Sequence, residues 1–135
     1  MTDRRIRVAL VDDDVSVRRA LARLLRAAGY EVEVYTTADA FLRSSSTESV
    51  DCALVDVRMT GETGLALARF LQIGGVNMPV ILMTGDVDVV LTTKAARCGA
   101  CALLSKPLTE ASVIAAIESA IAAKDSAMAG RADPG

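Results

Sequence analysis

The sequence IRVALVDDD, residues 6–14, passes from an apolar stretch directly into three aspartates. From Val15 to Ala28, apolar residues recur at intervals of three and four, which is the spacing of an amphipathic helix, and Gly29 provides its end. A short apolar strand followed by a helix is the repeating unit of α/β proteins. This opening segment therefore predicts a strand over 6–11 and a helix over 15–28.

The same order of strand and helix recurs along the rest of the chain. The predicted strands are Ile6–Val11, Val32–Tyr35, Cys52–Asp56, Pro79–Met83 and Cys101–Leu104. The predicted helices are Val15–Ala28, Ala38–Arg43, Leu65–Ile73, Val87–Arg97 and Ala111–Ala123. Because runs that are apolar throughout need cover on both faces, we predict an α/β fold with a doubly wound, parallel, five-stranded sheet and helices on both sides.

Composition excludes several classes of protein. At 135 residues the chain has room for one domain, and a hydrophobic fraction of 52% argues against intrinsic disorder. The absence of histidine excludes Ser-His-Asp and Cys-His catalysis, histidine-bound metals and a phosphohistidine carrier. A net charge of −2 gives no basic surplus for direct binding of nucleic acid. Residues 1–123 are predicted to form the domain, and residues 124–135 a flexible tail or linker stub.

No apolar run approaches the roughly 18 residues of a membrane span, and no signal-peptide core follows the N-terminus. The chain also has an odd number of cysteines, which does not suit a framework of paired disulfides. Together these features predict a cytoplasmic protein without a membrane partner. Cys98 and Cys101 have a C-x-x-C spacing, but they follow a predicted helix rather than open one. Together with Cys52, we interpret them as buried, inert thiols.

Ligands of parallel α/β folds bind beyond the carboxyl ends of the strands. The residues predicted at those ends with reactive side chains are Asp12, Asp13, Asp56, Thr84 and Lys106. Carboxylates packed together there repel by about 4 kcal/mol per close pair, so a cation is expected among them. Oxygen ligands alone favour Mg²⁺, and a lysine and a hydroxyl beside them suit phosphoryl transfer to a carboxylate.

Five spaced motifs resemble the receiver domain of two-component response regulators. They are Val11-Asp12-Asp13-Asp14 with Arg18, Leu54-Val55-Asp56-Val57-Arg58-Met59 with Gly61 and Gly64, Val80-Ile81-Leu82-Met83-Thr84-Gly85, Gly99-Ala100, and Lys106-Pro107. The resemblance covers residues 5–122, and the chain is most similar to receivers that drive LuxR-type DNA-binding output domains. It implies a flavodoxin-like strand order of 2-1-3-4-5. It also implies a phosphoacceptor with self-catalysed phosphorylation and autodephosphorylation rather than a classical enzyme.

The resemblance implies a role for each acidic residue. Asp56 would be the phosphoacceptor, which takes the phosphoryl group from a histidine kinase or a phosphotransfer protein. Asp13, Asp56 and the backbone carbonyl of Arg58 would bind Mg²⁺ directly, while Asp12 would act mainly through water.

The resemblance also implies a switch. Thr84 would move toward the phosphoryl group, and Lys106, held by a cis peptide bond to Pro107, would pair with it. Receivers commonly place Tyr or Phe at the position of Leu103, where the rotamer follows the movement of the threonine, so leucine predicts an altered readout. Thr60 stands where the family often has proline, which predicts a less rigid loop.

Arg58 and Asp86 lie two residues after Asp56 and Thr84, respectively. Both are therefore expected beside the phosphoryl group. We hypothesise that they pair across the mouth of the pocket and restrict the water that hydrolyses the acyl phosphate.

Several alternatives remain at this stage. A phosphatase of the haloacid dehalogenase type would use Asp12 and Asp14 as a D-x-D motif, but it leaves Asp56 without a role. Asp14 is more simply interpreted as the N-cap of the first helix. The arginines of that helix are either a solvated face or part of a kinase-docking surface. A homodimer through the fourth helix, fifth strand and fifth helix competes with ordinary helix packing.

Overall fold

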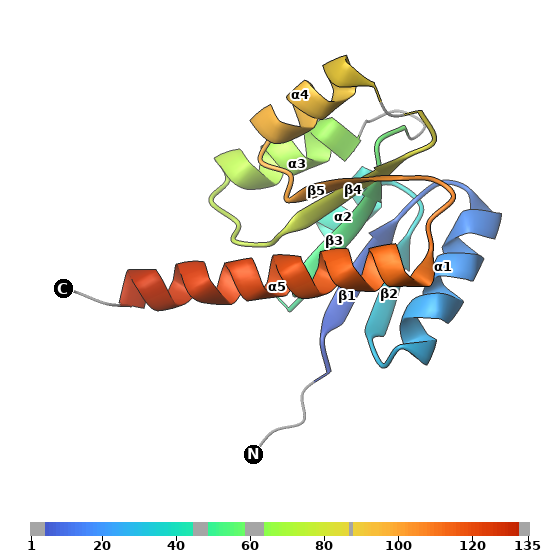
Figure 1. The fold of residues 1–135 in the computed structure, drawn as a ribbon, viewed down its shortest axis with the longest axis horizontal. Coiled ribbons are helices and arrows are strands. Elements are labelled where there is room, and N and C mark those ends of the chain that lie inside the picture. Colours follow the sequence, from blue (N-terminus) through green and yellow to red (C-terminus); the bar gives the residue numbers. More distant parts are fainter. Residues whose placement is uncertain (1–4, 45–48, 59–63, 87, 133–135) are drawn as a thin grey trace.

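The computed structural model describes residues 5–44, 49–58, 64–86 and 88–132. Within them, five strands alternate with five helices (Figure 1). The strands are β1 (Arg7–Val11), β2 (Glu31–Tyr35), β3 (Cys52–Asp56), β4 (Val80–Thr84) and β5 (Ala102–Ser105). The helices are α1 (Val15–Ala27), α2 (Ala38–Arg43), α3 (Gly64–Ile73), α4 (Val89–Arg97) and α5 (Glu110–Ala132).

All neighbouring strands are parallel, and their order across the sheet is β2-β1-β3-β4-β5. The chain runs from β1 to β2 on one side and then crosses to the other side of β1 to form β3. Such a reversal leaves a crevice at the carboxyl ends of β1 and β3, where open α/β sheets bind ligands. The predicted fold class and the 2-1-3-4-5 order are confirmed.

The core consists of two hydrophobic layers, one on each face of the sheet. On one face, α1 and α5 pack against inward residues such as Leu10 and Leu54. On the other face, α2, α3 and α4 pack against residues such as Val11 and Val55. β3 and β4 are buried at every position because helices cover both faces, which explains their continuous apolar sequence.

Most element boundaries lie within one residue of the prediction, and the start of α4 is an exception. We predicted a helix from Val87, which lies outside the described residues, whereas α4 begins at Val89. The physical reason is its cap, because the Asp88 side chain accepts a hydrogen bond of 2.7 Å from the Leu91 N–H. Gly29, with φ of +98°, follows α1 as expected of a helix-ending glycine.

The largest difference from the prediction is the length of α5. The helix continues through residues 124–132 to Ala132 instead of ending at Ala123, so the predicted end of this helix is wrong. This segment contains no proline and three alanines, the strongest helix formers, so a helix that reaches Ala123 is readily propagated. Neither α5 nor any other helix of the described residues combines the length and hydrophobicity needed to cross a membrane.

One of the three cysteines also departs from expectation. Cys52 and Cys98 are buried, whereas Cys101 is exposed because it lies in the connection before β5, at the surface of the molecule. All three are free thiols. Burial is the main reason that the pKa of Cys52 is raised to about 12, which keeps this thiol protonated and inert.

The first turn of α3 lies directly against the end of β3, and this contact yields a stability prediction. A Cβ atom added at Gly64 would overlap the backbone carbonyl oxygen of Asp56 and approach Leu82 Cδ2 at 3.1 Å. We expect Gly64→Ala to lower the free energy of unfolding by about 1–3 kcal/mol, as measured by urea denaturation.

The matched control is Gly85→Ala, because a Cβ atom there meets nothing within 4 Å. This variant should leave the free energy of unfolding unchanged or raise it slightly, because alanine reduces the conformational entropy of the unfolded chain. Equal unfolding midpoints for the two variants would show that the close approach of α3 to β3 is not a constraint.

Candidate functional site

Three aspartates gather at the carboxyl ends of β1 and β3. Asp12 and Asp13 follow β1, and Asp56 is the last residue of β3. Because these strands are neighbours in the sheet, one carboxylate oxygen of each residue lies within 4.8 Å of the others. Asp12 and Asp56 are buried, and Asp13 is more accessible to solvent. The predicted convergence of the three carboxylates is confirmed.

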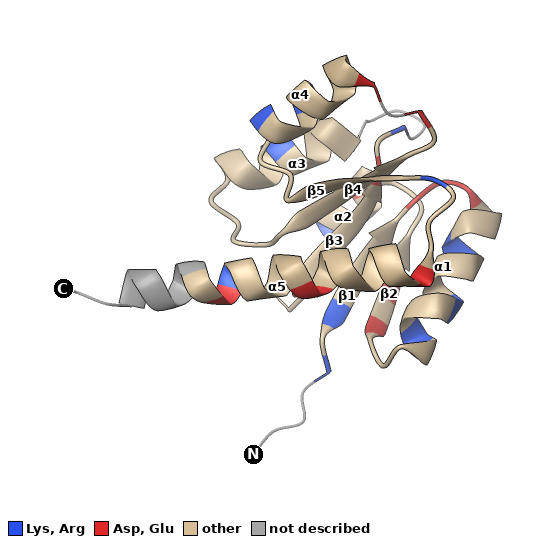
Figure 2. Ribbon diagram, viewed as in Figure 1, with Lys and Arg blue, Asp and Glu red and all other residues tan. Residues whose placement is uncertain are grey.

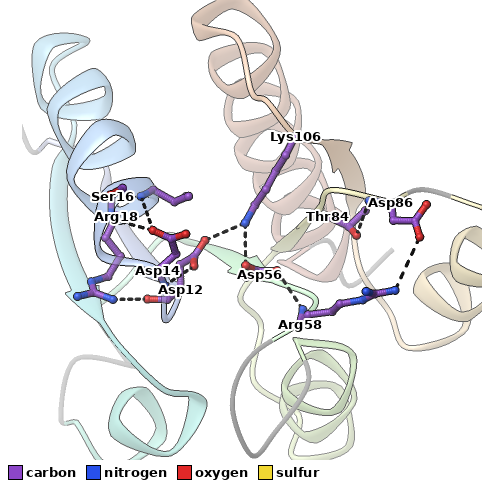
Figure 3. A network of polar contacts seen from close by, with 10 residues as sticks. Asp12, Asp14, Ser16, Arg18, Asp56, Arg58, Thr84, Asp86 and Lys106 are labelled. Carbon is purple, nitrogen blue, oxygen red and sulfur yellow. Dashed lines mark hydrogen bonds and ion pairs between the residues drawn. The ribbon is translucent and has the colours of Figure 1, made fainter.

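Lys106 holds the two buried carboxylates together (Figure 3). It comes from the connection between β5 and α5, and its peptide bond to Pro107 is cis. Its Nζ donates hydrogen bonds of 2.7 Å to Asp56 Oδ2 and 3.2 Å to Asp12 Oδ2. Both contacts are also ion pairs, so a single ammonium group faces two carboxylates at the centre of the site.

The second oxygen of each buried carboxylate is fixed by the backbone. Asp12 Oδ1 accepts a hydrogen bond of 2.9 Å from the Asp14 N–H, and Asp56 Oδ1 accepts one of 3.0 Å from the Arg58 N–H. Each donor lies two residues beyond its acceptor, in the loop that leaves the strand. The loops after β1 and β3 therefore set the orientation of both side chains.

The electrostatics of the cluster are unbalanced. Burial is the main reason that the pKa of Asp12 is raised above 3.8, and the charge of Asp56 adds to it, although the Asp14 N–H and Lys106 oppose the shift. Burial acts to lower the pKa of Lys106, but the hydrogen bonds with Asp56 and Asp12 outweigh it, so this pKa is raised. The lysine is therefore firmly protonated, yet it supplies one positive charge to three carboxylates.

The donor set fits a hard divalent cation. At 4.8 Å and an effective dielectric near 20, two carboxylates repel by about 3.5 kcal/mol, less where water screens the exposed Asp13. All ligand atoms in the cluster are oxygens, as Mg²⁺ requires, and Asp13 leaves one side open to water or to a phosphate. An acidic triad of this kind is typical of the magnesium sites of receiver domains.

A pocket of about 280 Å³ lies beside Asp56, toward β4. Its lining residues are Asp56, Arg58, Thr84, Gly85, Asp86 and Lys106. Thr84 ends β4 and is buried, and its Oγ1 accepts a hydrogen bond of 3.2 Å from the Asp86 N–H. A nucleophilic carboxylate, an ammonium group and a hydroxyl thus border one space large enough for a phosphoryl group.

Arg58 and Asp86 both line this pocket, and their side chains point toward one another (Figure 3). Arg58 Nη2 lies 3.9 Å from Asp86 Oδ2, and the two side chains are 78% and 74% exposed. The contact that we hypothesised is thus present at the pocket mouth, as a loose and solvated ion pair.

Asp14 belongs to the helix and not to the acidic cluster. Its Oδ1 accepts hydrogen bonds from the N–H groups of Ser16 (2.8 Å) and Val17 (3.2 Å), which confirms the predicted N-cap of α1. A phosphatase with a D-x-D motif would need this carboxylate at the reaction centre. The haloacid dehalogenase hypothesis is therefore wrong.

Sequence reasoning missed the position of one side chain. The guanidinium of Arg18 donates a hydrogen bond of 2.7 Å from Nη1 to the backbone carbonyl of Asp12, which ties the start of α1 to the site. Arg18 belongs to the first motif quoted from the sequence, but its spacing of six residues from Asp12 did not indicate this contact. Leu103 is half-buried and packs against the core layer of α2, α3 and α4, while Thr60 and Met59 lie outside the described residues.

Comparisons with known proteins agree on one family. The model of the response regulator receiver domain matches residues 8–118. The transcriptional regulatory protein FixJ of Azorhizobium caulinodans is 41% identical over 114 residues, which are 84% of this chain and 54% of that protein. The response regulator protein TodT of Pseudomonas putida is 34% identical over 121 residues, 90% of this chain and 53% of that protein.

Two solved structures have the same fold and similar sequence. The crystal structure of FixJ-N has a TM-score of 0.78 and 34% identity, and it covers 90% of this chain and 95% of that one. The response regulator StyR has a TM-score of 0.84 and 34% identity, with 95% of this chain and 65% of that chain covered. The chain spans about half the length of the curated relatives that it matches.

The raised pKa of Asp12 yields a prediction for stability without metal. A carboxyl group with a raised pKa is harder to ionise in the folded chain than in the unfolded one, so its charge lowers stability as pH rises above 3.8. In EDTA at pH 7, Asp12→Asn should increase the free energy of unfolding by on the order of 1 kcal/mol, the usual scale of one substitution.

The gain should shrink at pH 4, because a raised pKa makes Asp12 take up a proton in the folded chain more readily than an ordinary aspartate does. Asp14→Asn is the control, because it removes a charge nearby and keeps the capping oxygen, and it should change stability little. The electrostatic explanation fails if Asp12→Asn is no more stable than the parent at pH 7, or if its gain is the same at both pH values.

Proposed function

The chain belongs to the response regulator receiver domain family, and on this premise we propose that Asp56 accepts a phosphoryl group from a histidine kinase or a phosphotransfer protein. Such a domain is a phosphoacceptor signalling module and not a classical enzyme. The observation that supports Asp56 most strongly is its position, at the end of β3, beside Lys106 and at the wall of the 280 Å³ pocket.

The proposed transfer is a displacement at phosphorus. A carboxylate oxygen of Asp56 forms a new O–P bond while the P–N bond of the partner's phosphohistidine breaks, and the released imidazole nitrogen takes a proton from solvent. The Arg58 N–H and Lys106 hold the carboxylate in place, and Lys106 also pairs with the phosphoryl oxygens. Orientation and charge neutralisation are the main contributions of a protein to such a step.

We propose Mg²⁺ as the cofactor of this site. Asp13, Asp56 and the backbone carbonyl of Arg58 would bind it directly, and Asp12 through water. A bound Mg²⁺ neutralises charge on the phosphoryl oxygens. The hydrogen bonds from Asp14 to Asp12 and from Arg58 to Asp56 keep the carboxylates oriented for this role.

The proposed switch begins with Thr84. Phosphorylation adds about −1.5 to −2 charge to Asp56, and the Thr84 hydroxyl, which accepts from the Asp86 N–H, would turn to donate to the new oxygens. Leu103 has no phenol, so its half-buried side chain would report the movement through packing against the adjacent core layer alone.

A pocket on one side of α1 suits the phosphodonor protein. It measures about 430 Å³ and lies next to Lys106, and its apolar lining comes from Val17, Ala20, Leu21, Pro107 and Leu108. We propose that the kinase or phosphotransfer partner docks there, because its phosphohistidine must reach Asp56 from this edge of the sheet.

The signalling output is proposed from the relatives. FixJ and TodT are named as regulators, and each is about twice as long as the matched segment, so we propose that this receiver controls a LuxR-type output domain in the cytoplasm. Residues 124–135 would then link the domain at 1–123 to it. A homodimer through α4, β5 and α5 is proposed because Val89 and Val90 on α4 are 82% and 62% exposed.

Phosphorylation can be tested by intact mass spectrometry. With Mg²⁺ and acetyl phosphate, the chain should gain one phosphoryl group, and EDTA or Asp56→Asn should prevent the gain. Asp14→Asn is the matched control, since it changes an aspartate at the same edge of the sheet that only caps α1, and it should be phosphorylated normally. The assignment would be contradicted if the Asp56→Asn variant still gained the mass of a phosphoryl group. It would also be contradicted if that variant steadily hydrolysed a phosphomonoester.

The role of the ion pair between Arg58 and Asp86 can be tested by dephosphorylation. We propose that it restricts water at the pocket mouth, so Arg58→Ala and Asp86→Ala should each speed hydrolysis of the acyl phosphate by about two- to fivefold, the scale of an exposed pair. Phosphate release after removal of the donor measures the rate, and Arg69→Ala, on α3, is the control. Unchanged rates in both variants would refute this role.

A further inference from the structure

A second groove lies on the other side of α1, between this helix and the edge strand β2. Its volume is about 610 Å³. The lining residues are Val15, Arg18, Arg19, Ala22, Arg23, Arg26 and Val34. None of them lines the acidic pocket or the apolar pocket beside Lys106, so the groove is a separate feature of the surface.

The groove concentrates positive charge in a chain whose net charge is −2. Arg19, Arg23 and Arg26 recur at intervals of four and three residues, which places them along one face of α1. Figure 2 shows several basic positions along this helix. Among the residues that the structure describes, no acidic side chain lines the groove. The glutamates of β2, Glu31 and Glu33, alternate with the valines and point to the opposite face, where they pair with an arginine of β1.

Two of the four arginines that line the groove already bind backbone carbonyls, and the other two are available to a ligand. Arg18 donates to the Asp12 carbonyl at 2.7 Å, and Arg26 donates to the Val32 carbonyl at 3.3 Å. Within the described part of the chain, by contrast, no ion pair or side-chain hydrogen bond involves Arg19 or Arg23. Both are exposed on the surface of α1. They therefore present two unneutralised guanidinium groups to the same space.

The groove also has apolar walls. Val15 of α1 and Val34 of β2 are 49% and 46% exposed, and the buried Ala22 of α1 also lines the groove. Among the described helices, α1 and α5 cover this face of the sheet and three cover the other, which leaves Val34 of β2 partly uncovered. The sheet therefore extends past its helical cover at the β2 edge.

We infer that this groove binds a nucleoside diphosphate or triphosphate. Guanidinium groups bind phosphates through paired hydrogen bonds and stack on aromatic rings, and the valine side chains offer an apolar surface to a base. The volume lies within the roughly 300–1,000 Å³ of small-molecule sites. A protein partner needs about 800 Å² on each side, whereas this lining comes from one helix face and a single residue of β2.

Calorimetric titration of the full chain with ADP tests the inference. EDTA removes metal ions that could carry the nucleotide to the acidic cluster. Low salt preserves the electrostatic attraction between the arginines and the phosphates. We expect saturable binding that weakens by about tenfold or more in the double variant Arg19→Gln/Arg23→Gln. The matched control, Arg69→Gln/Arg97→Gln, removes the same charge from exposed positions of α3 and α4 and should bind ADP like the parent.

Ligand fragments and peptide competition decide the class of ligand. Adenosine and pyrophosphate should each bind at least about tenfold more weakly than ADP, and NMR shifts induced by ADP should map to α1 and β2. The inference is overturned if binding does not saturate at millimolar ADP, or if both double variants lose the same affinity for ADP. It is also overturned if pyrophosphate binds as tightly as ADP. Displacement of ADP by a tighter acidic peptide would overturn it in favour of protein docking.

Discussion

The arrangement of this molecule depends on one electrostatic constraint, which is that two buried carboxylates share a single ammonium group. The parallel order of the sheet places the ends of β1 and β3 side by side, so Asp12 and Asp56 cannot avoid each other. Lys106 lies 2.7 Å and 3.2 Å from their oxygens and offsets part of the repulsion. Because the charge remains unbalanced, a cation or a new charge at Asp56 must change the energy of the whole site.

Backbone packing transmits this constraint into the fold. Asp56 pairs with Met83 in the register between β3 and β4, and a slip of one residue would turn its side chain to the other face of the sheet. Gly64 allows α3 to approach the Asp56 carbonyl, and its N–H donates to the Val57 carbonyl at 2.9 Å. The position of the carboxylate is thus fixed by strand pairing and by a glycine, neither of which carries charge.

The sequence was sufficient to predict the features that depend on local pattern. Apolar runs located the strands, Asp14 and Gly29 marked the ends of α1, and parallel topology implied that the strand ends converge. Features that depend on tertiary contacts were not predictable in this way. The exposure of Cys101 follows from its place in a surface connection, and the hydrogen bond from Arg18 to the Asp12 carbonyl requires the orientation of α1.

The acidic pocket has few donors in reserve, which bears on how the proposed signal would travel. Lys106 already serves two carboxylates, so a phosphoryl group on Asp56 must draw further donors from its surroundings. Thr84 is the buried hydroxyl of the pocket, and its rotation would release the Asp86 N–H at the same time. The movement would therefore reach the loop before α4 directly through the backbone. We propose that this route through the loop lets a receiver with leucine at position 103 signal without an aromatic side chain.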